Sequence, residues 1–369
     1  MGFRGYAELR ATFGAGPQLV WGPNAAGKTT LLEAMVLCAR GRSHRATSDA
    51  ELIRWGDPFA RVEAALVEPA ATIEIALVRD GPAAGRKRVR VNGVPRRPTA
   101  LGGAVRVVLF APEEMLLVAG SPGLRRDALD RVAGDRSPAH ARATAMYERA
   151  LRQRNGLLKS IREGSAARDQ LRYWDDVLIA AGGAVIAGRL AALAALAGPL
   201  AAAHGEIAPD EGPLELRYVG SAAQRPGEEP GEALARRLAE TADKEVWNGT
   251  TLVGPHRDDV AFLLGDREMA GTASRGQQRS AILALKLAEL DLLARLDGRP
   301  PLLLLDDVFS ELDPARRAHL VRRIAELPQA FVTTTTLDDL DPELRAIGTA
   351  WRVEATEGGG ARITAGGER

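Results

Sequence analysis

The pattern of hydrophobic and polar residues near the amino terminus predicts a strand, a turn and a helix, in that order. Residues 18–21 form a short apolar run, and residues 22–27 are glycine and other turn-forming or small residues. From residue 28 to residue 35 the apolar positions recur at helical spacing. A glycine turn between a strand and a helix is the setting in which a chain can wrap around a phosphate group.

Further along the chain the same pattern predicts more strands. Polar and apolar residues alternate over 61–67 and 72–78, which predicts antiparallel strands with a hairpin tip near 80–82. Apolar runs at 105–110, 301–305 and 330–336 predict further strands, and strand patterning also resumes at 250–253. We therefore expect an α/β protein that includes antiparallel strands.

Between these strands lies a segment of different composition. From about residue 122 to residue 178 the chain is charged and helical in its periodicity, and residues 125–172 carry twelve Arg or Lys against six Asp or Glu, a net +6. Residues 206–245 carry ten acids against five bases, a net −5. We predict a discontinuous head formed by 1–121 and 247–369, interrupted by a mostly helical inserted domain at 122–246 that includes a basic arm.

Composition narrows the class of protein. The 369 residues are 46% hydrophobic and 26% charged with a net charge of +1, which is typical of a folded protein and excludes a globally basic one. The single cysteine, Cys38, predicts core packing in a reducing compartment. The amino terminus lacks a signal peptide, and the most apolar stretch, 190–203, is short and interrupted by Gly198 and Pro199. We predict a cytoplasmic protein with no membrane partner.

The turn after the first strand fits the phosphate-loop pattern G-x-x-x-x-G-K-[ST] in full. Backbone N–H groups of such a loop cradle phosphate oxygens, the lysine reaches the β and γ phosphates, and the hydroxyl ligates Mg²⁺. The pattern therefore predicts ATP and Mg²⁺ as cofactors. The predicted cofactor-binding residues are Gly22, Pro23, Asn24, Ala25, Ala26, Gly27, Lys28, Thr29 and Thr30.

An acid pair follows the leucine-rich run at 301–305. Acids at the carboxyl end of a buried parallel strand lie where ligands bind in an open α/β sheet. We predict that Asp306 organises Mg²⁺ together with Thr29, and that Asp307 polarises the attacking water. Asp306, Asp307 and Lys28 are thus the predicted catalytic residues.

Two more segments resemble motifs of the ABC-type ATPases, which include transporter subunits, SMC proteins and their DNA-repair relatives. One is Ser274, Arg275, Gly276 and Gln277, which resemble the signature motif, and the other is 310–313, which resembles the D-loop with Ser310 and Asp313. The resemblance implies an ABC-type head with a mixed-sheet lobe and an antiparallel β-lobe. It also implies that the signature of one protomer caps the nucleotide of a second. ATP would then hold a homodimer together.

Within that group the chain resembles the RecF family of bacterial recombinational-repair proteins. The resemblance rests on residues 3–6, 41–45 with 51–56, 110–130, 253–259 and 305–313, and so covers most of the chain. It implies an ATP-dependent dimer that clamps double-stranded DNA or single-strand/double-strand junctions at gaps. It also implies slow, DNA-stimulated ATP hydrolysis, association with the nucleoid, and cooperation with RecO and RecR in loading RecA.

The chain departs from these patterns at three places. Ala25 stands where related loops usually have glycine, and a Cβ fits there only if the backbone φ is negative. Asp307 replaces the catalytic glutamate of transporter-type members and is one methylene shorter, so hydrolysis should be slow. The strand at 330–336 ends in threonines without the switch histidine of transporters.

Clustered cations are the sequence footprint of duplex binding. One candidate cluster is Arg86, Lys87 and Arg88, and the other is Arg149, Arg152 and Arg154 on the inserted helices. A solvated hairpin and a helix face paired to its own acids remain equally good interpretations of the two clusters. The segment from His256 to Asp259 follows the strand predicted at 250–253, and its one histidine and two acids are too few for a metal site. A structural or interface role is favoured, and a role in sensing DNA or nucleotide stays open.

Three other functions remain to be weighed against a DNA-repair ATPase. A transporter subunit should carry the switch histidine and the catalytic glutamate, and a small-molecule phosphate-loop kinase would need neither signature nor D-loop. A DNA scaffold that binds ATP without turnover cannot be separated from the leading hypothesis by sequence.

Overall fold

The computed structural model describes residues 1–79, 85–98, 101, 105–356 and 360–366. The predicted hairpin tip near 80–82 therefore lies outside the described residues. The chain divides into two compact units, the first formed by 1–115 with 289–369 and the second by 116–288. The second unit contains the predicted insertion at 122–246 and also residues 247–288, which the sequence analysis assigned to the head. The domain boundaries stay a prediction.

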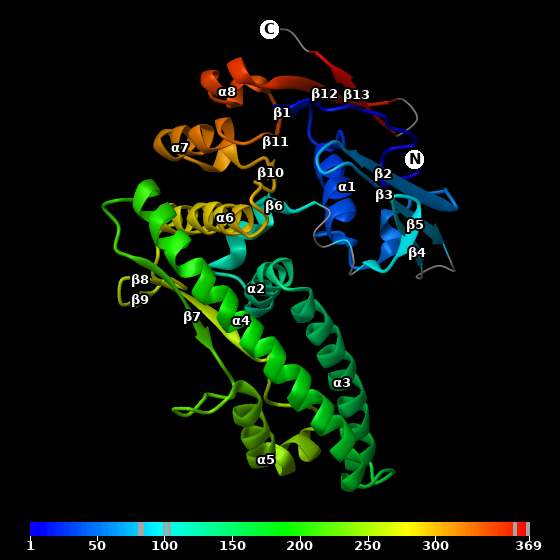
Figure 1. Cartoon of the computed structure of the whole chain (residues 1–369), viewed down its shortest axis with the longest axis vertical. Coiled ribbons are helices and arrows are strands. Elements are labelled where there is room, and N and C mark those ends of the chain that lie inside the picture. Colours follow the sequence, from blue (N-terminus) through cyan, green and yellow to red (C-terminus); the bar gives the residue numbers. More distant parts are fainter. Residues whose placement is uncertain (80–84, 99–100, 102–104, 357–359, 367–369) are drawn as a thin grey trace. The chain divides into compact units, whose positions relative to one another are not determined.

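A six-stranded sheet forms the centre of the first unit, in the order β13-β12-β1-β11-β10-β6 (Figure 1). All neighbouring pairs are parallel except β12 with β13, so the sheet is mixed as predicted. Its strands are β1 (Gly16–Trp21), β6 (Val107–Phe110), β10 (Leu302–Asp306), β11 (Gln329–Thr334), β12 (Thr349–Ala355) and β13 (Ala361–Ala365). The helices of this unit are α1 (Lys28–Arg40), α7 (Pro314–Ala325) and α8 (Pro342–Ile347), together with the carboxyl-terminal part of α6.

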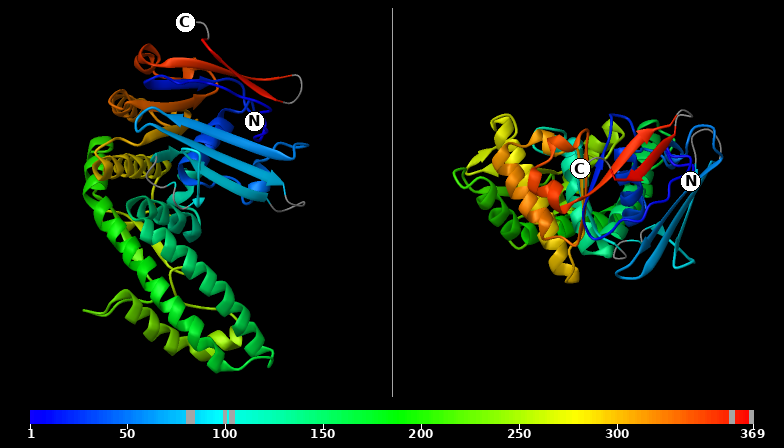
Figure 2. Two further views of the ribbon diagram at one scale, coloured as in Figure 1. Left: turned by 45° about the vertical axis from the view of Figure 1, so that its right-hand side comes forward. Right: turned by 90° about the horizontal axis from the view of Figure 1, so that it is seen from above.

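A second, antiparallel sheet forms the predicted β-lobe and can be followed in Figure 2. It contains β2 (Phe59–Leu66), β3 (Ala71–Arg79), β4 (Gly85–Val91) and β5 (Val94–Arg96), in that order. Helix α1 packs against both sheets, because Leu32 and Val36 lie in the core of the first and Leu37 and Cys38 in the core of the second. Cys38 is therefore a core residue, and its burial raises the pKa of the thiol to about 12.

The second unit is mostly helical, as predicted for the insertion. Its elements are α2 (Pro122–Arg136), α3 (Pro138–Arg162), α4 (Leu171–Ile207), α5 (Pro230–Asn248), β7 (Leu214–Val219), β8 (Asp259–Leu264), β9 (Arg267–Glu268) and the first part of α6 (Arg275–Asp297). Helices α3 and α4 pack against each other and lie closest near the segment that connects them (Figure 1). Prolines at the first positions of α2, α3 and α5 favour helix initiation there.

Two expectations about this unit are wrong. Residues 250–253 form no strand, and the strand β8 begins only at Asp259. Helix α4 continues through Gly198 and Pro199 for 37 residues in all. By length and composition the segment Arg168–Ile207 could cross a membrane, but α4 packs on α2, α3 and α5 and carries the buried, ion-paired Arg189, as a core helix does.

Candidate functional site

The phosphate loop connects β1 to α1, as the sequence predicts. Gly22 has φ 150°, and a Cβ at this position would lie 2.1 Å from the carbonyl oxygen of Val353. Gly27 has φ 113° and caps the amino terminus of α1. Both positions require glycine, the first for space and the second for its backbone conformation.

Lys28 lies inside the curve of the loop. Its Nζ donates hydrogen bonds to the carbonyl oxygens of Gly22 (2.6 Å) and Pro23 (3.0 Å), and the residue is 8% exposed. Burial lowers the pKa of Lys28, while the nearby carboxylates of Asp307 and Asp306 oppose that shift. The ammonium group is thus held by neutral carbonyls at the place where a phosphate group would offer a stronger, charged acceptor.

The backbone at Ala25 does not have the negative φ that a residue with a Cβ was expected to need there. Its φ is +63°, in the left-handed region that favours glycine. A residue with a Cβ in that conformation costs roughly 1–2 kcal/mol. The loop therefore keeps its shape at this position under local strain, which neighbouring contacts must offset.

The acid pair lies where the sequence predicts it, at the end of β10. The Thr29 hydroxyl donates to Oδ1 of Asp306 over 3.0 Å, although the two residues are 277 positions apart in sequence. A hydroxyl and a carboxylate side by side fit Mg²⁺, which binds one or two carboxylates together with substrate phosphates and water. When bound, Mg²⁺ would neutralise phosphate charge at this point.

Asp307 is the second residue with a strained backbone at this site. Its φ is +53°, and its side chain is half-buried. Burial raises the pKa of its carboxyl and the negative charge of Asp306 adds to this, while Lys28 opposes the shift. Strained non-glycine residues concentrate at functional sites, so this geometry agrees with the predicted role of Asp307.

The predicted D-loop residues take part in local backbone structure. The Ser310 hydroxyl donates to the carbonyl oxygen of Asp307 over 2.9 Å. Asp313 caps α7 by accepting from the backbone N–H of Arg316 at 3.0 Å, and it also forms an ion pair with that side chain.

The loop is braced by residues at the amino terminus whose role the residue patterns did not reveal. Arg4 forms a two-pronged ion pair with the fully buried Glu33 of α1 (3.0 and 2.9 Å). The Tyr6 hydroxyl donates to the carbonyl oxygen of Gly27 over 3.1 Å. The resemblance at residues 3–6 was the only signal in the sequence for this brace.

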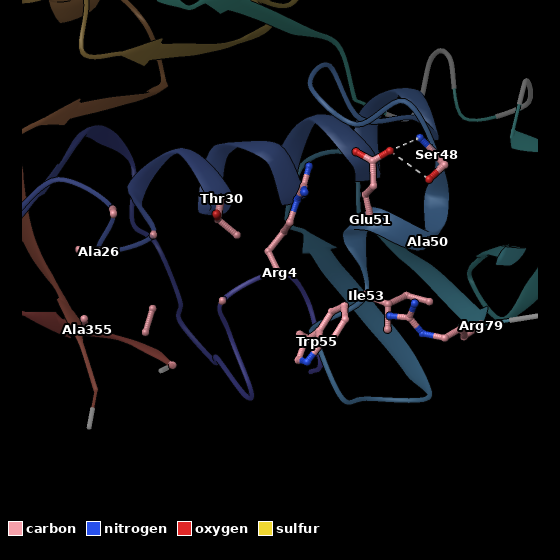
Figure 3. A pocket seen from close by; sticks show the side chains of 15 residues that line it. Arg4, Ala26, Thr30, Ser48, Ala50, Glu51, Ile53, Trp55, Arg79 and Ala355 are labelled. Atoms are coloured by element: carbon pink, nitrogen blue, oxygen red, sulfur yellow. Dashed lines mark hydrogen bonds between the residues drawn. The ribbon is translucent and has the colours of Figure 1, made fainter. Parts of the chain in front are cut away.

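A cavity of about 760 Å³ opens beside the phosphate loop. Figure 3 shows Ala26 and Thr30 of the loop region on one side and Ile53, Trp55 and Arg79 on the other. Trp55 is 95% exposed, more than any other large hydrophobic residue among those that the structure describes. Its indole is one of the side chains that line the cavity and is open to solvent there.

The predicted signature residues begin α6 in the second unit. Ser274 and Gln277 form a reciprocal cap, because the Ser274 backbone N–H donates to Oε1 of Gln277 (2.9 Å) and the Gln277 N–H donates to the Ser274 hydroxyl (3.2 Å). Ser274 and Arg275 are exposed. The cap leaves an accessible helix amino terminus, which favours binding of an anion such as a phosphate group.

The first group of candidate DNA-binding cations divides between two faces of β4. Arg86 and Arg88 are exposed. Lys87 faces the other way, as does the buried Val89, and its Nζ pairs with Asp49 and donates to the carbonyl oxygen of Gly41, both at 2.7 Å. Lys87 is thus held by structural contacts rather than displayed with the two arginines.

The second group divides in the same way on α3. Arg149 and Arg152 are exposed, whereas Arg154 is 2% exposed. The Arg154 guanidinium pairs with Asp175 (2.6 Å) and Glu245 (2.7 Å). Arg154 is a structural residue of the core of this unit and is not available to DNA there.

The segment from His256 to Asp259 also has structural contacts. Asp258 is 1% exposed and accepts from the Tyr218 hydroxyl (2.5 Å) and the backbone N–H of Ser221 (2.6 Å), and Asp259 forms a two-pronged ion pair with Arg125. The segment leads into β8, whose first residue is Asp259, and the strand predicted before it at 250–253 does not form. Among the described residues, no group of three or more His, Cys, Asp or Glu could hold a metal ion.

His256 is the least expected member of this segment. Its Nε2 faces the carbonyl oxygen of Thr251 (3.3 Å), which can only accept, so the Tyr147 hydroxyl donates to Nδ1 at 2.6 Å. Burial lowers the pKa of His256 to about 4. The imidazole is therefore neutral at physiological pH.

Comparison with known proteins gives consistent results. Residues 1–351 match the family model described as the RecF/RecN/SMC N terminal domain. The chain is 38% identical to the DNA replication and repair protein RecF of Halalkalibacterium halodurans, over 95% of both chains. It is 40% identical to RecF of Chloroflexus aurantiacus, over 95% of this chain and 96% of the relative.

Comparison with solved structures agrees with the sequence comparison. A structure of the recombination mediator protein RecF with ATP, in the RecFOR pathway, has a TM-score of 0.87 at 28% identity and covers 100% of this chain and 96% of that one. An Smc head domain with an extended coiled coil, from Pyrococcus furiosus, has a TM-score of 0.52 at 15% identity, covering 99% and 94% of the two chains. The latter shows a shared fold only.

Proposed function

Because the chain belongs to the RecF family of DNA replication and repair proteins, we propose that it is an ATP-dependent DNA-binding protein of recombinational repair. ATP binding drives two ABC-type heads together, and the dimer clamps double-stranded DNA or single-strand/double-strand junctions at gaps. The observation that carries the proposal is the meeting of Lys28, Thr29 and Asp306 around one loop. The relatives named as mediators in the RecFOR pathway support RecR, together with RecO, as partners in loading RecA.

The cavity beside the loop gives the nucleotide a place for its base. Phosphates on the loop would leave the nucleoside next to Thr30, on the side where the cavity opens. The exposed indole of Trp55 offers a flat surface on which a purine can stack, and Arg79 lines the same side. ATP, which has both a triphosphate and a purine, suits this site.

The dimer is tested by sedimentation velocity with and without saturating ATP and Mg²⁺. The signature at α6 of one protomer should cap the nucleotide of the other, so ATP shifts mass from monomer to dimer. Ser274→Arg should abolish the shift while leaving ATP binding intact, and Lys28→Ala should abolish both. An unchanged mass for the wild-type protein in saturating ATP would contradict the proposal.

DNA binding is tested through its salt dependence. Arg149 and Arg152 are exposed on α3, so replacing both with glutamate should lower the slope of log affinity against log salt by about 2 units. Reversal of Arg217, an exposed arginine on β7 outside both clusters, serves as the matched control. An unchanged slope in the double variant would remove α3 from the DNA surface.

A non-hydrolysing DNA scaffold is the second candidate, favoured by the short side chain at position 307. The two are separated by steady-state ATP turnover with and without gapped duplex. Slow turnover that DNA stimulates and that Asp307→Asn abolishes supports the ATPase. If wild type and Asp307→Asn show equal rates, the scaffold is the better description.

A further inference from the structure

A buried threonine joins the two halves of the phosphate-binding site. Strand β11 lies between β1, which leads into the phosphate loop, and β10, which ends at the acid pair. Thr333 is in register with Val20 of β1 and with Asp306 of β10. The sheet order therefore brings its side chain to the one place that lies between loop and acids.

The Thr333 hydroxyl makes two different hydrogen bonds there. It donates to Oδ1 of Asp306 over 2.6 Å and accepts from the backbone N–H of Asp307 over 3.0 Å. The residue is 0% exposed, so water cannot replace either bond. One hydroxyl thus holds the side chain of the first acid and the backbone of the second.

The two hydrogen bonds of Thr333 restrain the side chain of Asp306 and the backbone of Asp307. Asp306 accepts from Thr29 at the same Oδ1, so Oδ2 is the oxygen that remains to face a metal ion or its water. Asp307 has a φ of +53°, and the bond to its N–H ties that unusual backbone to β11. Removing the hydroxyl would free Asp306 to rotate and Asp307 to relax.

We infer that Thr333 is a positioning residue, which fixes the carboxylate of Asp306 and the backbone of Asp307 in the arrangement that would hold Mg²⁺ and the nucleotide. This inference rests on the proposed function, since it assumes that ATP and Mg²⁺ bind at this loop. Thr333 itself touches neither. It acts through the two aspartates, as a residue that supports metal ligands does.

The test compares three variants with matched shapes. Thr333→Val keeps the volume and loses the hydroxyl, and Thr333→Ser keeps the hydroxyl and loses a methyl group. Thr334→Val is the control, because Thr334 is also buried (2% exposed) but its hydroxyl donates to the carbonyl oxygen of Thr336 and not to the acids. If Thr333→Val does not fold, Thr333→Ser and Thr333→Ala give the same comparison.

Two measurements are made on each variant. The first is equilibrium binding of a fluorescent ATP analogue across Mg²⁺ concentrations, and the second is the kcat and KM of ATP hydrolysis. In Thr333→Val the Mg²⁺ concentration for half-maximal binding should rise about tenfold and kcat should fall about tenfold or more. KM in excess Mg²⁺ should stay within about twofold, since Lys28 and the loop are untouched. Thr333→Ser and the control should resemble wild type.

The inference is overturned if Thr333→Val matches wild type in its Mg²⁺ requirement, or if folded Thr333→Ser fails as badly as Thr333→Val. Failure of the proposed function is recognised separately on the wild-type protein. No ATP binding by wild type would reject the ATP site and this inference together. Binding without hydrolysis would reject turnover only, and the Mg²⁺ titration would still decide the role of Thr333.

Discussion

Two groups of charged residues in this protein are built in opposite ways. At the phosphate loop, Lys28 donates hydrogen bonds to two neutral carbonyl oxygens with the acid pair nearby, and Asp307 and Ala25 have left-handed backbones. In the second unit, Arg154 and Arg189 are equally buried but are paired with carboxylates over short distances. The charges of the first group are available to pair with a ligand. The charges of the second group pair with one another.

This contrast distinguishes a binding site from a network of structural ion pairs. Both regions present Arg, Lys, His, Asp or Glu in short motifs, and both are buried. Only at the phosphate loop are charge and backbone strain found together, with an accessible cavity beside them. Burial of paired charges produces rigidity, whereas incomplete pairing with strain indicates a ligand.

The largest expected effect is a loss of stability on breaking the ion pairs of Arg154. Arg154→Met should lower the free energy of unfolding by about 3–5 kcal/mol, because Glu245 is 0% exposed and would lose its counter-charge. Arg152→Met, two positions away and exposed, should change it by less than about 0.5 kcal/mol. Urea denaturation measures both. A stable Arg154→Met that loses DNA affinity would show that Arg154 is a surface ligand.

The pH dependence of stability sharpens the same contrast. Burial lowers the pKa of His256 to about 4. Between pH 6.5 and pH 4 the unfolded chain therefore binds a proton at this residue, whereas the folded chain does not. Stability is therefore full above pH 6.5 and declines as pH falls toward 4, by about 3 kcal/mol from this residue. His256→Asn, which can still accept from Tyr147, should flatten the decline in urea titrations between pH 7 and 4. Equal slopes would mean that His256 titrates normally.

Substitution of Lys28 in the phosphate loop should change the affinity for ATP far more than the stability of the fold. Lys28→Ala removes a cation that donates to two carbonyl oxygens and has Asp306 and Asp307 nearby. The unfolding midpoint should fall by less than in Arg154→Met, which breaks two close ion pairs. ATP should bind about 10- to 100-fold more weakly, as expected for losing a bond to a charged group. Fluorescent-nucleotide titration measures this, with the exposed Lys159→Ala as control. Destabilisation without loss of ATP affinity would reverse the assignment.

The smallest effect concerns backbone strain in the loop. Ala25→Gly should stabilise the protein by about 1 kcal/mol, because glycine adopts a φ of +63° without penalty. Ala26→Gly is the control, since Ala26 is 2% exposed and is not among the residues with positive φ. It should destabilise by about 0.5–1 kcal/mol. If both substitutions destabilise in thermal unfolding, Ala25 is not strained.

Local patterns in the sequence predicted the elements that carry the phosphate site. The glycine turn between β1 and α1 and the leucine run of β10 are each formed by neighbouring residues, so their periodicity and turn chemistry are visible without tertiary information. The antiparallel strands of the β-lobe were predicted for the same reason, whereas the mixed sheet was predicted from the resemblance to ABC-type heads.

What could not be predicted depends on partners distant in sequence. Arg154 reads as a surface cation because Glu245, which neutralises it, lies 91 positions later. Lys87 is similar, since its partner Asp49 lies on another element. The positive φ of Ala25 and the bridge through Thr333 depend on loop closure and sheet order, neither of which a linear pattern records.

The central claim, that ATP switches this protein onto DNA, is tested most directly by titrating gapped and blunt duplex DNA with and without ATP at two salt concentrations. Our account predicts tighter binding with ATP, a preference for the gapped duplex, and affinity that falls steeply as salt rises. Equal affinity for DNA in the presence and absence of ATP would contradict it.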